Sequence, residues 1–350
     1  TADGLPLTAG SADFSKFVSV GNSLTAGFSD NALFIEGQLS SYPAILASQF
    51  ALVGGGEFRT PLMNDNVGGL LLGGNLIAGP RLFFNGTGPA PVAGTPSTEV
   101  SSVLTGPFNN MGVPGAKSFH LVAPNYGNVA GVALGQSNPY YVRFASSPSA
   151  TILGDAVAQN PTFFSLWIGN NDVLGYATSG GSGTNQIGNF NPATYGPNDI
   201  TDPNVFANVY TALVDGMTAN GAKGVVANLP YVTALPYFTA VPFNAVPLNA
   251  ATATQLNAGY AQYNGGLVVA QNAGLISAAE RTRRTITFAA GQNAVVMVDS
   301  YLTNLSALGL PSYRQATSAD LLVLPSRSII GTTVGGNPAQ VFGLHRSPGA

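Results

Sequence analysis

The chain has 350 residues, of which 45% are hydrophobic and only 8% are charged, and its formal net charge is −3 at pH 7. An ordinary domain carries roughly 25% charged residues, so we expect this surface to consist mainly of Asn, Thr, Ser, Gln and backbone. The 12 basic residues are scattered singly except for the run RTRR at 281–284, which leaves no basic stripe to follow a nucleic acid. The absence of cysteine excludes disulfides, thiolate metal sites and a cysteine nucleophile.

Composition marks no boundary between independent halves, so we expect residues 1–350 to form one domain with insertions at about 58–105 and 175–201. The longest uncharged apolar run, Val67–Gly79, is too short and too rich in glycine to cross a bilayer of about 30 Å as a helix. We therefore expect no transmembrane span. The low charge and a first residue, Thr1, that is not methionine favour a secreted or bacterial cell-envelope protein whose signal sequence is not part of the given chain.

Short apolar runs that end in polar or glycine turns predict buried strands, and longer segments with helical spacing between them predict helices. The predicted strands lie in Lys16–Ser23, Pro161–Asp172, Ala222–Pro230 and Asn293–Ser300. The predicted helices are Tyr42–Gly54 after a Ser40-Ser41 cap, Asp202–Gly221 with Asp202 as its cap, and Asn249–Gly274. This order predicts an α/β fold with an open parallel sheet, in which ligands bind at the carboxyl ends of the strands.

Ser23 follows the first predicted strand, in the stretch GNSLTAG from Gly21 to Gly27. At a strand-to-helix junction, free backbone N–H groups and the helix dipole favour negative charge, as nucleophilic attack by a serine requires. The same position suits a serine that only caps the helix. This stretch alone leaves both interpretations open.

Two later stretches carry residues that could stabilise an oxyanion. Gly115 lies in the loop Asn109–Ser118, where a residue without a Cβ can turn its N–H towards a ligand, although Pro-Gly is first of all a turn signal. Asn171 lies in Trp167–Asp172, at the end of a predicted strand, where its side-chain amide is a good oxyanion donor. The Asn-Asn-Asp sequence there is equally typical of a helix entry.

Taken in order, the three stretches resemble the blocks of the SGNH (GDSL-type) hydrolases, a family of esterases and lipases. Gly169–Asp172 is similar to the Gly-x-Asn-Asp block of that family. The resemblance covers about residues 17–299 and implies a three-layer α/β/α sandwich with a flavodoxin-like parallel sheet. It implies that Ser23 is the nucleophile, and that the oxyanion hole consists of the Ser23 N–H, the Gly115 N–H and the Asn171 side chain. It also implies a serine esterase that uses neither cofactor nor metal.

The chain departs from the family pattern in two places. Asn22 stands where the family usually has Asp, which keeps hydrogen-bonding capacity and loses a charge. The closing Asp-x-x-His block, which supplies the general base, is absent. His120 is best interpreted as a locally hydrogen-bonded loop residue, and His345, the remaining candidate base, has Phe342 where Asp should be. We therefore expect the base to lie beyond Ala350 and the 350-residue form to have little esterase activity.

A different class of function stays open, namely a non-catalytic envelope protein of the same fold that binds glycan or a surface polymer. A phosphate-binding loop is disfavoured because GNSLTAG has no Lys after its second Gly. A metal site is disfavoured because the two histidines lie far apart without carboxylates around them. The substrate is expected to be a small-molecule or lipid ester (lipid, aryl or acetyl), and the apolar insertions favour a lipid or aryl ester.

Overall fold

The computed structural model describes residue 4 and residues 6–330, and the chain divides into two compact units. Unit 1 consists of Thr1–Asp172, Gln186–Tyr195 and Thr201–Leu229, and unit 2 of Val173–Asn185, Gly196–Ile200 and Pro230–Ala350. The second predicted insertion, 175–201, is therefore shared between the units. Composition predicts one domain and contains no signal for this division.

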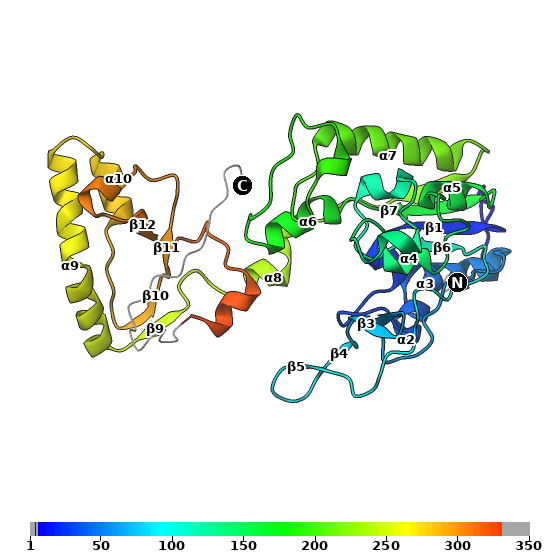
Figure 1. Ribbon diagram of the computed structural model, residues 1–350, viewed down its shortest axis with the longest axis horizontal. Coiled ribbons are helices and arrows are strands. Elements are labelled where there is room, and N and C mark those ends of the chain that lie inside the picture. The colour runs from blue at the N-terminus through cyan, green and yellow to red at the C-terminus, as the bar shows by residue number, and fades with distance from the viewer. Residues whose placement is uncertain (1–3, 5, 331–350) are drawn as a thin grey trace. The chain divides into compact units, whose positions relative to one another are not determined.

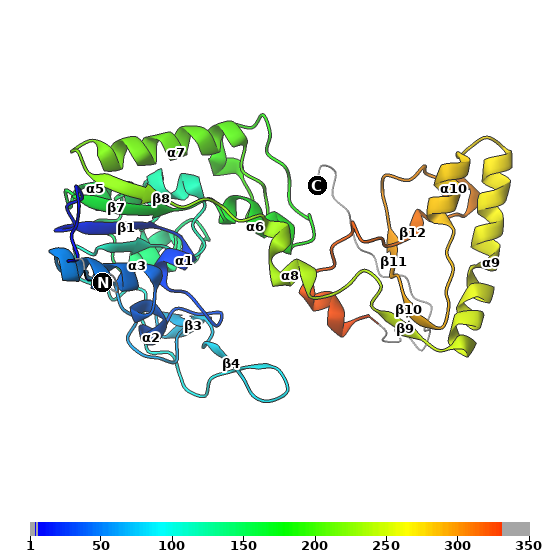
Figure 2. The ribbon, with the colours of Figure 1, turned by 180° about the vertical axis from the view of Figure 1, so that it is seen from behind.

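The centre of unit 1 is a four-stranded parallel sheet with the strand order β6-β1-β7-β8. Figure 1 labels β6, β1 and β7 of this sheet, and Figure 2 labels β8. Its strands are β1 (Phe17–Gly21), β6 (Asn110–Gly112), β7 (Phe163–Trp167) and β8 (Lys223–Val226). Three of them lie within runs that the sequence predicts to be strands, whereas β6 lies in a stretch predicted to be a loop. The predicted α/β class with a parallel sheet is confirmed.

Successive side chains of a strand point to opposite faces of its sheet, and β1 shows this alternation. Val18 and Val20 belong to a buried cluster with residues of α5 (Ile152–Val157) and α7 (Pro203–Thr218). The ring of Phe17 instead lies 5.1 Å from that of Phe50, in α3 (Tyr42–Phe50). Figure 1 shows α5 and α7 along the sheet, and Figure 2 shows α3 from the other side.

The predicted helix starts are confirmed in three long helices. Ser41 caps α3, and Asp202 caps α7 by accepting hydrogen bonds from the backbone N–H of Asn204 (2.8 Å) and Val205 (3.1 Å). Asn249 caps α9 (Ala250–Asn272) in the same way. Each cap satisfies N–H groups that have no partner inside the helix.

The first predicted insertion, 58–105, forms two antiparallel hairpins, β2 with β3 and β4 with β5. Carboxylates fasten it: Asp65 accepts from the N–H groups of Gly68 (2.9 Å) and Ser97 (2.8 Å), and Glu99 accepts from those of the β2–β3 turn. The other elements of unit 1 are α1 (Ser23–Ala26), α2 (Ile35–Leu39), η1 (Ala51–Val53), β2 (Leu70–Leu72), β3 (Asn75–Ala78), β4 (Leu82–Phe84), β5 (Pro89–Pro91), η2 (Ser118–Val122), η3 (Val129–Gly131), α4 (Pro139–Val142) and η4 (Pro192–Thr194).

In unit 2, the long helix α9 packs one side into a hydrophobic core. Its buried residues follow helical spacing: Ala253, Leu256, Tyr260, Tyr263, Leu267 and Ala270. Within the described part of the chain, no helix combines the length and the apolar character that crossing a membrane requires. The remaining elements are α6 (Asn171–Thr178), which begins in unit 1, then η5 (Val232–Ala234), α8 (Pro236–Thr239), β9 (Val246–Leu248), α10 (Ala278–Arg284), β10 (Gly291–Asn293), β11 (Val296–Val298), η6 (Ser306–Leu308), β12 (Tyr313–Gln315) and η7 (Leu324–Ser328).

The prediction that Asn293–Ser300 adds a strand to the parallel sheet is wrong. Its strand, β11, pairs antiparallel with β12 in unit 2, and β10 pairs antiparallel with β9. Asp299 directly follows β11, and its carboxylate accepts a hydrogen bond from Nε of Arg314, in β12, at 2.6 Å. This ion pair stabilises the pairing of β11 with β12. An apolar run predicts a buried strand, but it does not specify the partner strand.

Candidate active site

Three segments that are distant in sequence end at the same edge of the parallel sheet. In the register of the sheet, Gly21 at the end of β1 lies opposite both Gly112 of β6 and Trp167 of β7. Ser23, Gly115 and Asn171 follow these three strand ends within a few residues. The carboxyl edge of a parallel sheet is the usual place for a ligand.

Hydrogen bonds then join the three segments to one another directly. Each pair of segments shares one: from Val113 N to Gly21 O (3.0 Å), from Asn22 Nδ2 to Asn170 Oδ1 (3.2 Å), and from Asn171 Nδ2 to Ala116 O (2.8 Å). The three predicted residues therefore lie on one connected framework of backbone and amide groups.

Ser23 is the first residue of α1 and is not its cap. That role belongs to Asn22, whose Oδ1 accepts from the N–H of Leu24 at 3.1 Å. The hydroxyl of the half-buried Ser23 makes no hydrogen bond within residues 4 and 6–330, so the capping interpretation fails. Because α1 has only four residues, individual N–H groups rather than a long helix dipole would act on a negative charge here.

Two glycines let α1 lie directly against the strand ends. A Cβ at Gly21 would come within 2.1 Å of Thr25 Oγ1, and one at Gly112 within 2.2 Å of the backbone nitrogen of Ala26. Neither distance is possible for real atoms, so both positions require glycine. This close packing fixes the height of Ser23 above the sheet edge.

The loop around Gly115 is held from both sides. Gly115 itself has a φ of +81°, in the left-handed region, and is exposed. Asn138 Nδ2 donates to the carbonyl oxygen of Pro114 at 2.8 Å, and Asn171 Nδ2 donates to that of Ala116 at 2.8 Å. The N–H of Gly115 donates no hydrogen bond to another described residue. Its direction is thus fixed by its neighbours while it stays available to a ligand.

Asn171 and Asp172 divide two tasks between them. The amide of Asn171 carries two N–H groups, of which the bond to Ala116 uses one, so the second can serve a ligand. The buried Asp172 accepts from the backbone N–H of Ser118 at 2.8 Å and from its Oγ at 2.7 Å. Burial raises the pKa of Asp172 despite these bonds. Asp172 therefore fastens the Gly115 loop to the start of α6.

Sequence reasoning did not identify the supporting residues Asn138, Ser118 and Asp172. Asp172 is part of the Gly-x-Asn-Asp stretch, so its place beside Asn171 was a usable signal. Asn138 and Ser118 gave no such signal, because each lies in a stretch of ordinary loop residues. Their hydrogen bonds go to residues far away in the chain, from Asn138 to Pro114 and from Ser118 to Asp172.

His120 is the single histidine among the described residues, and its surroundings are local. Its Nδ1 accepts from the N–H of Lys117 at 3.0 Å, and its ring stacks on Tyr126 with 4.3 Å between centroids. Burial, and next the charge of Lys117, lower the pKa of His120 to about 4, so it is neutral at pH 7. The other candidate base, His345, lies outside the described residues, as does Phe342.

Comparisons with known proteins add no relative. No family model, curated protein or solved structure matches the chain. Within the part of the chain that the structure describes, no group of three His, Asp or Glu side chains is placed to hold a metal ion. The three motifs and their convergence at one sheet edge are therefore the features that bear on function.

Proposed function

We propose that this protein is a serine hydrolase of the SGNH type that cleaves carboxylic esters through an acyl-enzyme. The observation that carries the proposal is the convergence of Ser23, Gly115 and Asn171 on hydrogen-bonded segments at the carboxyl edge of the sheet. A nucleophile with three nearby N–H donors, from Ser23, Gly115 and the Asn171 amide, is the arrangement that acyl transfer needs.

The finer architecture belongs to the same proposal, namely a three-layer α/β/α sandwich with a flavodoxin-like sheet. In chain order the sheet strands run 2-1-3-4, which agrees with the first four strands of the flavodoxin-like order 2-1-3-4-5. In that fold the ligand site lies where the strand order reverses, between the first and third strands. Here those strands are β1 and β7, which precede Ser23 and Asn171.

In the proposed reaction, the Ser23 hydroxyl attacks the ester carbonyl carbon while a general base takes its proton. The carbonyl oxygen becomes an oxyanion that the three N–H donors stabilise, the alcohol leaves with a proton, and water then hydrolyses the acyl-enzyme. His345 is the candidate base within the chain. His120 is disfavoured because its Nδ1 is already engaged and burial keeps its pKa low.

The substrate class is an apolar ester, with a lipid or aryl ester preferred over an acetyl ester. This preference is supported by the hairpins of 58–105, which expose Leu76 (56%), Ile77 (43%), Phe83 (47%) and Phe84 (72%) to solvent. Such side chains offer binding surface to an acyl or aryl group. A secreted or cell-envelope location, where such esters are met, is part of the proposal.

Hydrolysis of p-nitrophenyl butyrate tests the proposal. Where the base is present within the chain, Ser23→Ala should lower kcat/KM by more than about 10³-fold, because the nucleophile and its base act as a unit. Ser29→Ala, a nearby exposed serine, is the matched control and should leave the rate within twofold. A rate that survives Ser23→Ala would contradict the proposal.

The base is tested with the two histidine variants. If His345 is the base, His345→Ala should lower kcat/KM by as much as Ser23→Ala, whereas His120→Ala should change it little. If the 350 residues contain no base, wild-type turnover should already be slow, and neither histidine variant should lower it further. A large loss in His120→Ala alone would overturn the assignment.

A non-catalytic protein of the same fold that binds glycan or a surface polymer is the second candidate. It is favoured by one observation, that the single described histidine is engaged with Lys117 and Tyr126. A binding module should retain an immobilised polysaccharide and should not react with a fluorophosphonate. Covalent reaction at Ser23 would favour the hydrolase.

A further inference from the structure

Four hydroxyl groups form a cluster inside unit 1, beside the carboxyl end of β1. They belong to Ser19 of β1, Ser165 of β7, Thr25 of α1 and Tyr42, the first residue of α3. Ser19 and Ser165 are register partners on neighbouring strands, and their Oγ atoms lie 2.6 Å apart. Ser19, Thr25 and Ser165 are buried, and Tyr42 is half-buried. Burying hydroxyl groups is unfavourable unless they are paired, so the cluster requires an explanation.

Tyr42 is the member that connects the other three. Its hydroxyl oxygen lies 3.1 Å from Thr25 Oγ1, 3.2 Å from Ser19 Oγ and 3.5 Å from Ser165 Oγ. A phenol both donates and accepts, so it can bond to α1 and to the sheet at the same time. The ring of Tyr42 also packs edge-on against Trp167, at the end of β7, with 5.6 Å between centroids. Tyr42 therefore joins α3 to the sheet and to α1.

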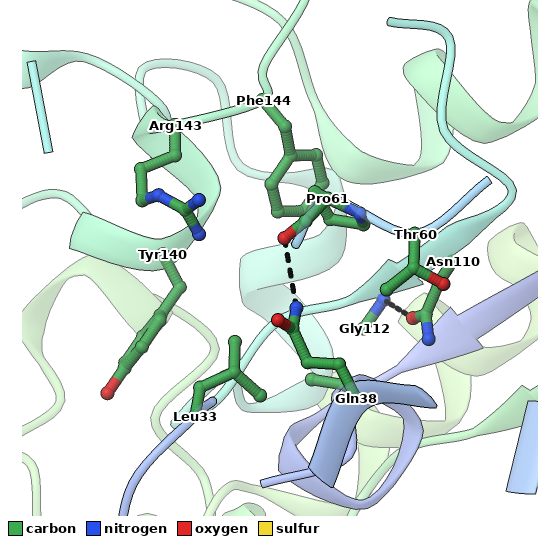
Figure 3. Close-up of a pocket in the computed structure, with 10 residues that line it drawn as sticks. Leu33, Gln38, Thr60, Pro61, Asn110, Gly112, Tyr140, Arg143 and Phe144 are labelled. Atoms are coloured by element: carbon green, nitrogen blue, oxygen red, sulfur yellow. Dashed lines mark hydrogen bonds between the residues drawn. The ribbon is translucent and has the colours of Figure 1, made fainter. Parts of the chain in front are cut away.

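Thr25 is the residue through which α1 is held from two sides. Its carbonyl oxygen accepts from Asn110 Nδ2 at 2.9 Å, and its hydroxyl bonds to Tyr42. Asn110 is oriented in turn, because its Oδ1 accepts from the N–H of Gly112 at 2.9 Å (Figure 3). A helix of only four residues is not stable through its own hydrogen bonds. These outside bonds to Thr25 therefore decide where α1 lies.

We propose that Tyr42 is a positioning residue for the candidate nucleophile. Its hydroxyl acts through Thr25, holds the orientation of α1, and so sets the direction of Ser23, which begins that helix. The catalytic consequence rests on the proposed hydrolase function, whereas the bond between Tyr42 and α1 concerns the fold alone. A small misplacement of a nucleophile slows the chemical step more than it weakens binding, so the loss should appear in kcat and not in KM.

Tyr42→Phe tests the proposal, because it removes the hydroxyl and keeps the ring on Trp167. The kcat for p-nitrophenyl butyrate and the rate of fluorophosphonate reaction at Ser23 should each fall about tenfold, with KM within twofold. Tyr141→Phe is the matched control, a buried tyrosine of unit 1 whose hydroxyl bonds to Asp155 at 2.8 Å, and should keep these rates within twofold. Unchanged rates in Tyr42→Phe would overturn the proposal.

Trp167 is the single tryptophan of the chain, so its fluorescence reports on the packing beside Tyr42. Its emission maximum should be the same in Tyr42→Phe as in the wild type. A shifted emission together with lost activity would assign the loss to disturbed packing and would overturn the positioning role.

The other partner of the bond gives a conservative pair of variants. Thr25→Val keeps the shape of the side chain and removes its hydroxyl, so it should lower the rates as Tyr42→Phe does. Thr25→Ser keeps the hydroxyl and should retain most of the activity. The double variant Thr25→Val/Tyr42→Phe should be no slower than either single variant, because all three lose the same contact. Additive losses, or equal losses in Thr25→Val and Thr25→Ser, would overturn the proposal.

Hydrogen exchange gives a readout that does not need activity. The N–H groups of Ala26 and Phe28 donate to backbone carbonyl oxygens at the start of α1, each at 3.0 Å. Relative to β7, their exchange should be about tenfold faster in Tyr42→Phe and unchanged in Tyr141→Phe. A wild type that does not react with the fluorophosphonate would refute the hydrolase function, and exchange would still decide whether Tyr42 holds α1. Exchange in Tyr42→Phe equal to that of the wild type would overturn the inference.

Discussion

The two units of this chain use polar groups in opposite ways. The sheet edge of unit 1 is joined by neutral amides and hydroxyls, as in the Asn22–Asn170 and Asn171–Ala116 bonds. Unit 2 is fastened by buried ion pairs, above all those of Arg314, whose Nε, Nη1 and Nη2 all meet carboxylates. Neutral amides leave a second donor for a ligand, whereas the ion pairs saturate their donors. We therefore propose that the ligand chemistry belongs to unit 1, whereas the ion pairs of Arg314 stabilise unit 2.

The largest effect is expected from breaking the ion pairs of unit 2. Arg314→Met leaves the carboxylates of Asp299 and Asp320 without their counter-charge, which should lower the free energy of unfolding of unit 2 by about 3–5 kcal/mol. Hydrogen exchange read separately on peptides of α9 and of β1 measures this, with the exposed Arg283→Met as control. If Arg314→Met accelerates hydrogen exchange in β1 as much as in α9, the division of roles between the two units is refuted.

The next largest effect is expected from removing the side-chain amide of Asn171 in unit 1. Asn171→Ala removes one proposed oxyanion donor and should lower kcat by about 10² to 10³-fold, or about 2.7–4 kcal/mol of transition-state stabilisation. Asn170→Ala, at the neighbouring amide that accepts from Asn22, is the matched control and should cost less than tenfold. Equal losses in the two variants would indicate a structural role for Asn171 instead.

A smaller effect is expected from strain at Gly115. Gly115→Ala meets no atom closer than 3.8 Å, but its φ of +81° is unfavourable for alanine and should cost about 1–2 kcal/mol of stability. Because the loop would relax by turning its N–H, ester hydrolysis should fall as well. Gly54→Ala carries comparable strain at a φ of +91° outside the site. It should lower Tm and leave hydrolysis unchanged, and a similar loss of hydrolysis there would break the assignment.

A last effect, which develops only in acid, is a difference in acid sensitivity. The pKa of His120 is lowered to about 4 in the folded state, so its stabilisation of unit 1 is lost as pH falls from about 6.5 to 4. The pKa of Asp320 is lowered to about 2, so its contribution to unit 2 is lost only between about pH 4 and 2. Asp172, with a raised pKa, acts in the opposite direction in unit 1.

The contribution of His120 is therefore read from the difference between the wild type and His120→Gln in Tm measured from pH 7 to 4. The difference should shrink as pH falls through this window. A difference that does not change with pH would show that the histidine titrates normally.

The strands β1, β7 and β8 and the caps at Ser41 and Asp202 were predictable because each depends on neighbouring residues. The motifs predict Gly115 and Asn171 as site residues; the structure brings their segments together at the sheet edge, and their catalytic role stays a prediction. The strand β6 was not predicted because its three residues lie among turn signals. The antiparallel pairing of β11 with β12 was not predicted because an apolar run does not specify which strand it pairs with. Bonds between distant polar side chains, and the division into two units, depend on tertiary packing and leave no local pattern.

Mapping the site of fluorophosphonate labelling by mass spectrometry is the most direct test of the central claim, that Ser23 is a nucleophile served by backbone and amide donors. We expect one adduct, on the tryptic peptide that contains Ser23, strongly reduced in Asn171→Ala and absent in Ser23→Ala. No adduct on the wild-type chain, or an adduct that persists in Ser23→Ala, would contradict it.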